Sequence, residues 1–219
     1  MHEGKSQLWV RPLDSLAAQP LAGTDGGTYP FWSPDSSSLG FFADGKLKRI
    51  DIRGGAPQVL ANAGAGRGGA WNRDGIILFA PSIIGPLWKV PATSGEAAAV
   101  TRLETGQKSH RFPQFLPDGR HFVYFAQGGP GQGIYIASLD EGSSKRLANA
   151  DVAAVVSPSG FLLFQRQTTL LLKRSISRDK NFPAIRFRWP NRRPSKQHQT
   201  SLEFPQLRAL WPTGPARQA

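Results

Sequence analysis

The stretch that decides the fold is residues 29–42, YPFWSPDSSSLGFF, in which an aromatic strand runs into a Pro-Asp turn and a second apolar strand follows. The pattern returns as GGAWNRDGIILFA from Gly68, RFPQFLPDGRHFVYFA from Arg111 and VAAVVSPSGFLLF from Val152. A large or apolar residue precedes each turn and a turn residue lies three positions later, both at spacings of 39, 44 and 41. The two sets are Trp32, Trp71, Phe115 and Val156, then Asp35, Asp74, Asp118 and Ser159. Such recurrence indicates a repeat protein.

A second element follows each of these segments, reading LKRIDIRGG, LWKVPATSG, IYIASLDEG and, more weakly, LLLKRS; LWVRPLDS from Leu8 matches it too. Residues 28–61 therefore predict four short strands separated by turns at Pro34-Asp35, Asp44-Gly45 and Gly54-Gly55. Short strands with turn signals every eight to twelve residues are typical of all-β folds. About forty residues per four-stranded unit is the period of a propeller blade. We predict an all-β fold of the β-propeller type, built from four-stranded blades.

The repeat also predicts the domain boundaries. We place a half blade at 8–27 and blades at 28–66, 67–107, 110–150 and 151–174, which gives about four units within 1–174. A closed propeller has roughly four to eight blades. A four-bladed ring would need residues 8–22 to supply the outer strands of the last blade, and we expect an incomplete ring instead. Open blade edges would then favour self-association.

The run WSPDSSSLGFF and its echo FLPDGRHFVYF resemble the TolB-like, WD-type β-propeller repeats of bacterial proteins, over residues 8 to about 174. LWVRPLDS, PFWSPDS, GFFADGKLKRID and APQVLA are also similar to the propeller that follows the kinase and membrane segment in some bacterial transmembrane serine/threonine kinases. The resemblance implies a non-catalytic sensor or interaction domain, a fragment of a larger protein, with a protein or peptide partner. It also implies a periplasmic or extracytoplasmic location, although the residues themselves leave the cytoplasm open.

The charge is concentrated at the C-terminal end. Residues 173–219 hold 11 Lys+Arg and 2 Asp+Glu, against 16 and 13 in residues 1–172, within a total net charge of +12. We interpret 175–219 as a disordered or non-native basic tail, because the repeat stops where the composition changes. Arginines interleaved with Phe187 and Trp189 leave a nucleic-acid arm as a third alternative for function, although we do not expect nucleic acid to be a partner.

The sequence carries no motif of a catalytic centre. Gly-x-Ser-x-Gly, the P-loop and the kinase motifs are absent, and no run of eighteen apolar residues predicts a membrane span. Residues 64–69, GAGRGG, fit G-x-G-x-x-G, but a strand follows where dinucleotide binding needs a helix. We therefore expect neither enzyme activity nor a cofactor. The alternative is the propeller portion of a kinase or propeller-linked hydrolase.

Metal-ligating patterns are equally weak. The chain has no cysteine, and none of its histidines (His2, His110, His121 and His198) are paired at the spacing of a helical metal site, so we expect no metal. Asp35, Asp74 and Asp118 occupy the same turn position in successive blades. We interpret them as structural turn caps, with calcium binding as the lesser alternative.

The rim of the propeller is the best candidate for partner contact. Propellers bind through loops that rigid blades hold in place. Residues directly before the first strand of a blade usually border one face and the mouth of the central channel. This position predicts a contact rim formed by Tyr29, Arg67, His110 and Arg111. The alternative is that these residues only pack within the fold.

Overall fold

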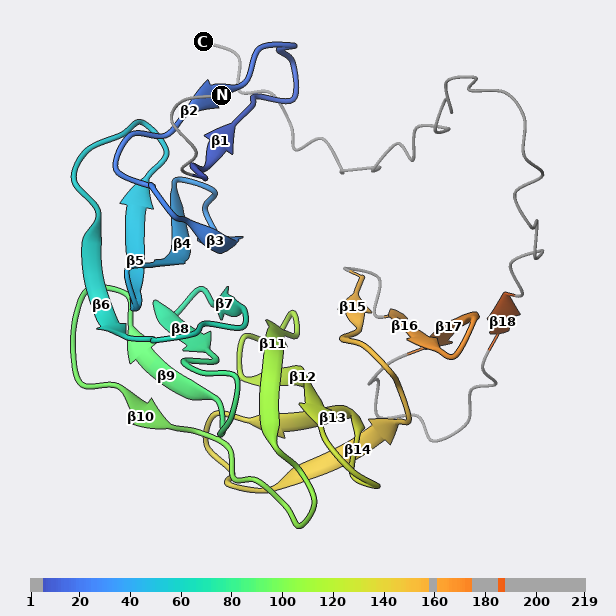
Figure 1. Ribbon diagram of the computed structural model, residues 1–219. Coiled ribbons are helices and arrows are strands. Elements are labelled where there is room, and N and C mark those ends of the chain that lie inside the picture. The colour runs from blue at the N-terminus through green and yellow to red at the C-terminus, as the bar shows by residue number, and fades with distance from the viewer. Residues whose placement is uncertain (1–5, 158–160, 175–184, 188–219) are drawn as a thin grey trace, which may run out of the picture. The chain divides into compact units, whose positions relative to one another are not determined.

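The computed structural model describes residues 6–157, 161–174 and 185–187. Every regular element in these residues is a β-strand, and none of them forms a helix that could cross a membrane. The strands form four antiparallel sheets of four strands and one sheet of two strands (Figure 1). Each four-stranded sheet is a meander, because its spatial order follows the chain order. The predicted all-β, propeller-type fold is confirmed.

The strands of each blade are short. Blade 1 contains β3 (Thr28–Trp32), β4 (Ser38–Ala43), β5 (Lys46–Asp51) and β6 (Gln58–Asn62). Blade 2 contains β7 (Gly69–Trp71), β8 (Ile76–Phe79), β9 (Trp88–Pro91) and β10 (Ala98–Ala99). Blade 3 contains β11 (Ser109–Phe115), β12 (His121–Gln127), β13 (Gly133–Ser138) and β14 (Ser144–Ala148). Blade 4 contains β15 (Val155–Val156), β16 (Phe161–Arg166), β17 (Thr169–Arg174) and β18 (Ile185–Phe187).

The two ends of the repeat differ from the predicted boundaries. β1 (Trp9–Val10) and β2 (Gln19–Pro20) pair with each other in the half blade. β18 pairs with β17, although it lies inside the predicted tail 175–219. The outer position of blade 4 is thus occupied by β18 and not by residues 8–22. The rest of the predicted tail lies outside the described residues, so its disorder stays a prediction.

The Asp-Gly signal of blade 1 gives the predicted hairpin. Asp44 and Gly45 both have positive φ, 52° and 69°, which is the signature of a type I′ turn. The turn sets the register, with Ala43 paired to Lys46 and Ser38 to Asp51 at the far end of β4 and β5. Because glycine and aspartate tolerate positive φ, the local sequence determines this register.

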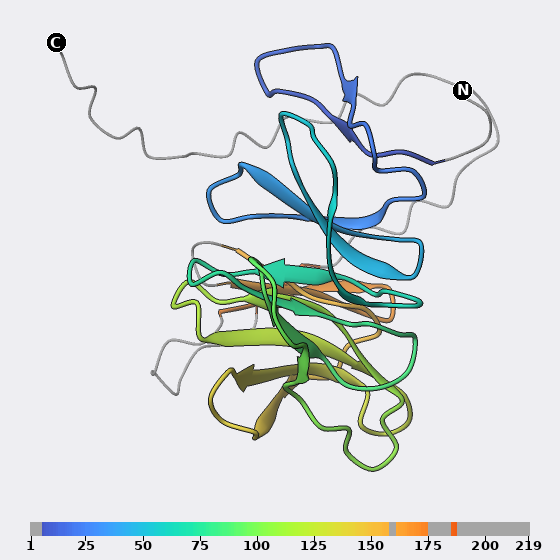
Figure 2. The same cartoon turned by 90° about the vertical axis from the view of Figure 1, so that its left-hand side faces the viewer.

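The core lies between neighbouring blades. Alternate residues of a strand point to opposite faces of its sheet, and both faces of β4 are covered. Phe42 packs with residues of β8 and β9 in blade 2, whereas Leu39 and Phe41 pack with Leu21 next to β2. The second strand of each blade therefore reads as a continuous apolar run, as in SLGFFA or FVYF. The side view shows the sheets of blades 1, 2 and 3 stacked one after another (Figure 2).

Glycine is needed where an aromatic ring lies directly on the backbone. A Cβ atom at Gly40 would lie 2.2 Å from the ring of Phe31, and one at Gly69 would lie 2.4 Å from the same ring. Phe31 in blade 1 thus packs on its own sheet and on the first strand of blade 2. The close approach of β3 and β7 depends on these two glycines.

Candidate functional site

An unusual backbone conformation recurs at equivalent positions in or next to the first strands of blades 1, 2 and 3. Tyr29, Gly68 and Phe112 each lie three positions before Trp32, Trp71 and Phe115, and their φ angles are 48°, 90° and 51°. Such positive values are ordinary for glycine, but they are strained for an aromatic residue. In blades 1 and 3 the position lies in a β-bulge, because the register shifts between Thr28 and Phe31 and between Arg111 and Gln114.

These three positions meet in space. The guanidinium of Arg67 lies over the Tyr29 ring, 5.7 Å from its centroid. The Tyr29 and Phe112 rings are 5.8 Å apart, and the Phe112 N–H donates to the Arg67 carbonyl at 3.0 Å. A Cβ atom at Gly68 would lie 2.8 Å from the Phe112 ring. Blades 1, 2 and 3 thus each contribute to one group, which we call the rim cluster: Tyr29, Arg67, Arg111 and Phe112.

Arg111 is fixed by two hydrogen bonds. Its Nε donates to the Ser109 hydroxyl and its Nη2 to the Ile83 carbonyl, each at 2.8 Å. Burial and the neighbouring Arg67 charge lower the pKa of Arg111 below its ordinary value. Arginine nevertheless stays protonated in proteins. Among the described residues neither Arg67 nor Arg111 forms an ion pair, so the rim cluster holds two cations without a protein carboxylate.

His110 does not lie in the rim cluster, contrary to the sequence prediction. Its side chain is fully buried; its Nδ1 is 2.8 Å from the Thr101 hydroxyl, and its Nε2 is 2.9 Å from Gln107 Oε1. The ring also contacts Tyr124, with 4.5 Å between centroids. Neighbouring residues of a strand point to opposite faces. His110 therefore faces the interior of blade 3 while Arg111 faces the rim.

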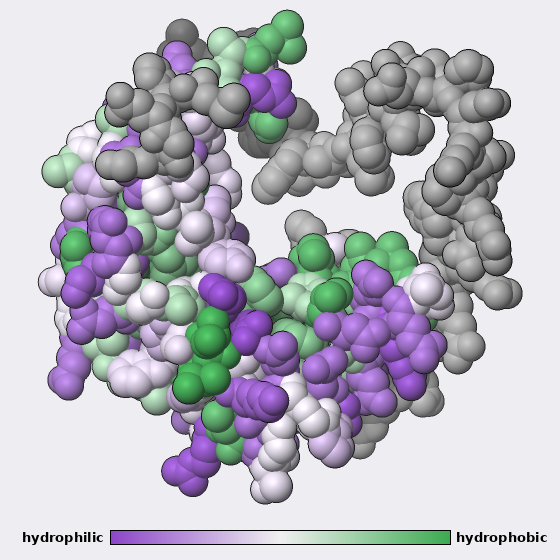
Figure 3. All heavy atoms as spheres, viewed as in Figure 1, coloured by the Kyte–Doolittle hydropathy of each residue, from purple (hydrophilic) through white to green (hydrophobic). Residues whose placement is uncertain are grey.

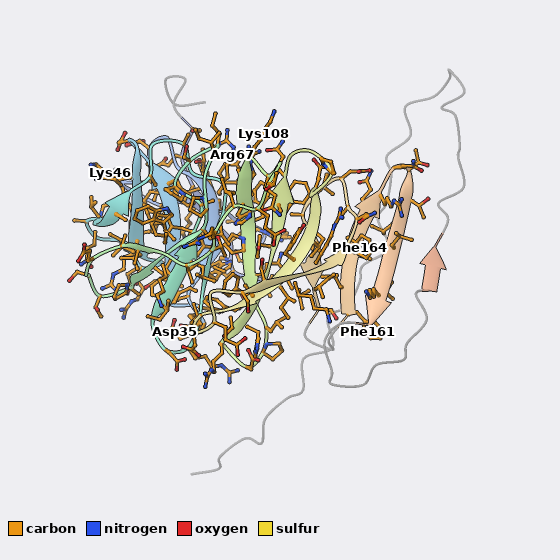
Figure 4. The ribbon with its side chains drawn as sticks, turned by 90° about the horizontal axis from the view of Figure 1, so that it is seen from below. Asp35, Lys46, Arg67, Lys108, Phe161 and Phe164 are labelled. Atoms are coloured by element: carbon orange, nitrogen blue, oxygen red, sulfur yellow. The ribbon has the colours of Figure 1, made fainter. Side chains whose placement is uncertain are left out.

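The opposite ends of the first strands carry the predicted turn residues. Figure 4 labels Arg67 and Lys108 on one side of the blades and Asp35 on the other. Asp35 Oδ1 accepts the hydroxyl of Ser33 and the N–H of Ser37, and Oδ2 accepts the Ser37 hydroxyl. The Ser33 hydroxyl first, then the two Ser37 groups, lower the pKa of Asp35 to about 2. Asp118 Oδ1 accepts two backbone N–H groups of its own turn. Both residues are therefore turn caps in this structure.

In blade 2 a different residue caps the turn. The Asn72 amide oxygen accepts the N–H groups of Asp74 and Ile76, and its nitrogen donates to the Gly119 carbonyl of blade 3 at 2.8 Å. Asn72 is equivalent to Ser33, whose hydroxyl accepts the N–H of Ser38 in blade 1. The sequence prediction of Asp74 as the cap missed this, although Asn72 is a common turn-forming residue.

Two shallow hollows lie on the side of blades 1 to 3 that carries Asp35, Asn72 and Asp118, which we call the turn side. Their volumes are about 420 and 370 Å³. Both are lined by Pro34, Trp71, Asn72 and Arg73, so they are neighbours. Of the predicted repeat positions, Trp32 is half-exposed on this part of blade 1, whereas Trp71 and Phe115 pack against the clusters between blades. Within the described ranges, no group of three or more His, Asp and Glu side chains is placed to hold a metal ion.

The sequence identified three of the four members of the rim cluster and missed Phe112. A signal for it was present, because Tyr29-Pro30 and Phe112-Pro113 are the same dipeptide type at equivalent repeat positions. The loop around Ile83 was also missed as a neighbour of Arg111. That contact joins residues 28 positions apart, and no local pattern encodes it.

Comparison with known proteins establishes the fold. No family model matches the chain, and no curated protein matches it in sequence. TolB from Acinetobacter baumannii is similar in structure, with a TM-score of 0.60 at 14% identity over 76% of this chain and 45% of the TolB chain. A chain of a nidogen/laminin complex has a TM-score of 0.59 at 12% identity, over 72% of this chain and 64% of its own.

An enzyme has the same fold. Oligogalacturonate lyase from Vibrio parahaemolyticus gives a TM-score of 0.60 at 12% identity, over 83% of this chain and 60% of the lyase. This chain thus has a TolB-like β-propeller fold and spans less than two thirds of each of these three proteins. Because enzymes and TolB share the fold at such low identity, fold alone does not decide the function.

Proposed function

We propose that the chain is a non-catalytic β-propeller module that binds a protein or peptide partner through the rim cluster. The observation that carries the proposal is the pair of aromatic residues held at positive φ, Tyr29 and Phe112. Such strain costs about 1–3 kcal/mol per residue and concentrates at functional sites. Tyr29 is 39% exposed, and the repeat places glycine at the equivalent position of blade 2. The Tyr29 ring is therefore exposed at this rim although its backbone conformation is strained.

The chemistry of the rim cluster suits binding better than catalysis. Its charged groups are the guanidiniums of Arg67 and Arg111, and a guanidinium is a poor general acid or base at physiological pH. The one histidine nearby, His110, is sealed in the interior of blade 3. Tyrosine and arginine are also the side chains enriched at protein interfaces.

The comparisons are compatible with this proposal without deciding it. One structural neighbour comes from a complex of two proteins, nidogen and laminin, and another is a lyase. The association with a membrane-bound kinase stays a prediction from resemblance. The nucleic-acid alternative concerns the segment 175–219, which, apart from β18, lies outside the described residues.

The test compares a variant that lacks both rings of the rim cluster with a control variant changed on the opposite side of the blades. Tyr29→Gly/Phe112→Gly removes both rings and gives each position the residue that blade 2 already uses there. Arg73→Ala changes an exposed side chain on the turn side and serves as the control. Each purified protein is used to capture partners from an extract of the source cell, and the captured proteins are quantified. We expect the wild type and Arg73→Ala to capture the same proteins. We expect the double glycine variant to capture none of them. Equal capture by all three, or capture by none, would refute the proposal.

A further inference from the structure

The rim cluster contains two arginines at the same repeat position. Arg67 and Arg111 each lie four residues before the aromatic residue that precedes the turn, in blades 2 and 3. The backbone hydrogen bond from Phe112 to Arg67 brings the two positions together. Burial and the Arg67 charge both lower the pKa of Arg111. The two positive charges therefore repel each other, and a nearby anion would relieve that repulsion.

Most N–H donors of these guanidiniums remain available. Each guanidinium has five N–H groups. Arg111 uses Nε and Nη2 on Ser109 and Ile83, and Arg67 uses Nη1 on the Gly66 carbonyl. Across the described ranges their other N–H groups have no protein acceptor. Because both side chains are also half-buried, a ligand that accepts from them would meet donors already held in place.

An apolar surface adjoins the arginines. Arg111 donates to the carbonyl of Ile83, whose side chain is 46% exposed, and the next residue, Ile84, is 67% exposed. Two backbone hydrogen bonds anchor the loop next to Ile84, since Gly85 donates to the Lys108 carbonyl and accepts from the His110 N–H. In the space-filling view, hydrophobic and hydrophilic side chains lie side by side over the region between β7 and β11 (Figure 3).

We propose that the rim cluster recognises an acidic peptide segment, with a carboxylate between Arg67 and Arg111 and a neighbouring aliphatic side chain on Ile83 and Ile84. The inference rests on the proposed function and names the chemistry of its partner. Guanidinium and carboxylate form strong charge-assisted hydrogen bonds of defined geometry. The exposed isoleucines favour a peptide over a sugar acid or a free phosphate, because neither of those brings an aliphatic side chain.

The test uses a fluorescein-labelled peptide, Gly-Ser-Ile-Glu-Ile-Gly-Ser, with fluorescence anisotropy on the full chain. We expect it to bind about tenfold or more tightly than the same peptide with Gln in place of Glu, because the neutral amide oxygen can accept a hydrogen bond but lacks the negative charge that strengthens bonds to guanidinium. Arg67→Gln and Arg111→Gln should each remove that preference. Arg73→Gln, on the turn side, should leave it unchanged. Ile84→Ser should weaken binding of the Ile-Glu-Ile peptide. It should not weaken binding of an analogue in which both isoleucines are alanine.

Several outcomes would overturn the inference. One is a Kd above about 1 mM for the Glu peptide. Another is equal binding of the Glu and Gln peptides by the wild type. A third is a preference for the Glu peptide that remains in both Arg67→Gln and Arg111→Gln. Tighter binding of trigalacturonate or inorganic phosphate than of the Glu peptide would assign the arginines to another anion. Circular dichroism and thermal unfolding of each variant identify any loss of folding. If the double glycine variant still loses its partner while the peptide fails, only this inference is wrong.

Discussion

Acidification is expected to destabilise the fold through His110. The side chain is fully buried, and burial lowers its pKa to about 4 from 6.5. Its two partners fit a neutral ring. The Gln107 carbonyl oxygen can only accept, so it takes the Nε2 proton, and the Thr101 hydroxyl accepts from the Leu87 N–H and donates to Nδ1. A second proton on Nδ1 would require the Thr101 hydroxyl to turn its own proton away, which leaves that buried proton without this acceptor.

The sign follows from which state binds the proton. Between pH 6.5 and 4 the unfolded chain carries a proton on His110 and the folded chain does not, so stability falls as the pH falls. The loss is about 2 kcal/mol at pH 5 relative to pH 7.5, and it approaches about 3 kcal/mol below pH 4. For a domain of this size the loss at pH 5 lowers the Tm by roughly 4–8 °C.

The assay is thermal unfolding at pH 7.5 and pH 5. His110→Gln should unfold at a lower temperature at pH 7.5 and should lose most of the acid-dependent drop. His121→Gln, at an exposed histidine that begins β12, should keep that drop. A wild-type Tm that is equal at the two pH values would refute the reasoning, as would an unchanged drop in His110→Gln. If that variant does not fold, an imidazole titration of the wild type by NMR that places the pKa of His110 near 6.5 gives the same refutation.

Three further substitutions test the packing and the turns. Gly40→Ala should cost about 2 kcal/mol, because its Cβ would lie 2.2 Å from the Phe31 ring, whereas Gly64→Ala, with no atom within 4 Å, should cost nothing in urea unfolding. Asn72→Ala should cost about 2 kcal/mol in the same assay, because two turn N–H groups and one carbonyl of blade 3 lose their partner. Tyr29→Gly should be more stable than Tyr29→Ala by about 1 kcal/mol, because only glycine adopts φ 48° freely; equal stability would contradict the strain.

The blades were predictable because their signals are local. The Pro-Asp and Asp-Gly turns determine where strands end, and the apolar second strand of each blade follows from burial on both faces. His110 was not predictable in this way. Its burial depends on Thr101 and Gln107, which come from the segment between β10 and β11, and on Tyr124 of β12. Such contacts arise from the packing of a blade, and the alternation along one strand does not reveal them.

The rim cluster shows how a repeat exposes a site that a single motif does not. The three blades require the same positive φ at equivalent positions, and Gly68 meets that requirement without strain. At about 1–3 kcal/mol per residue, the aromatic residues at the other two positions cost together roughly 2–6 kcal/mol. The contact between Tyr29 and Phe112 and the Arg67 guanidinium over Tyr29 return about 1–2.5 kcal/mol. At the middle of both ranges these two contacts offset less than half of the strain, which glycine would not incur. Contact with a partner is the reason that the proposed function supplies for the two rings.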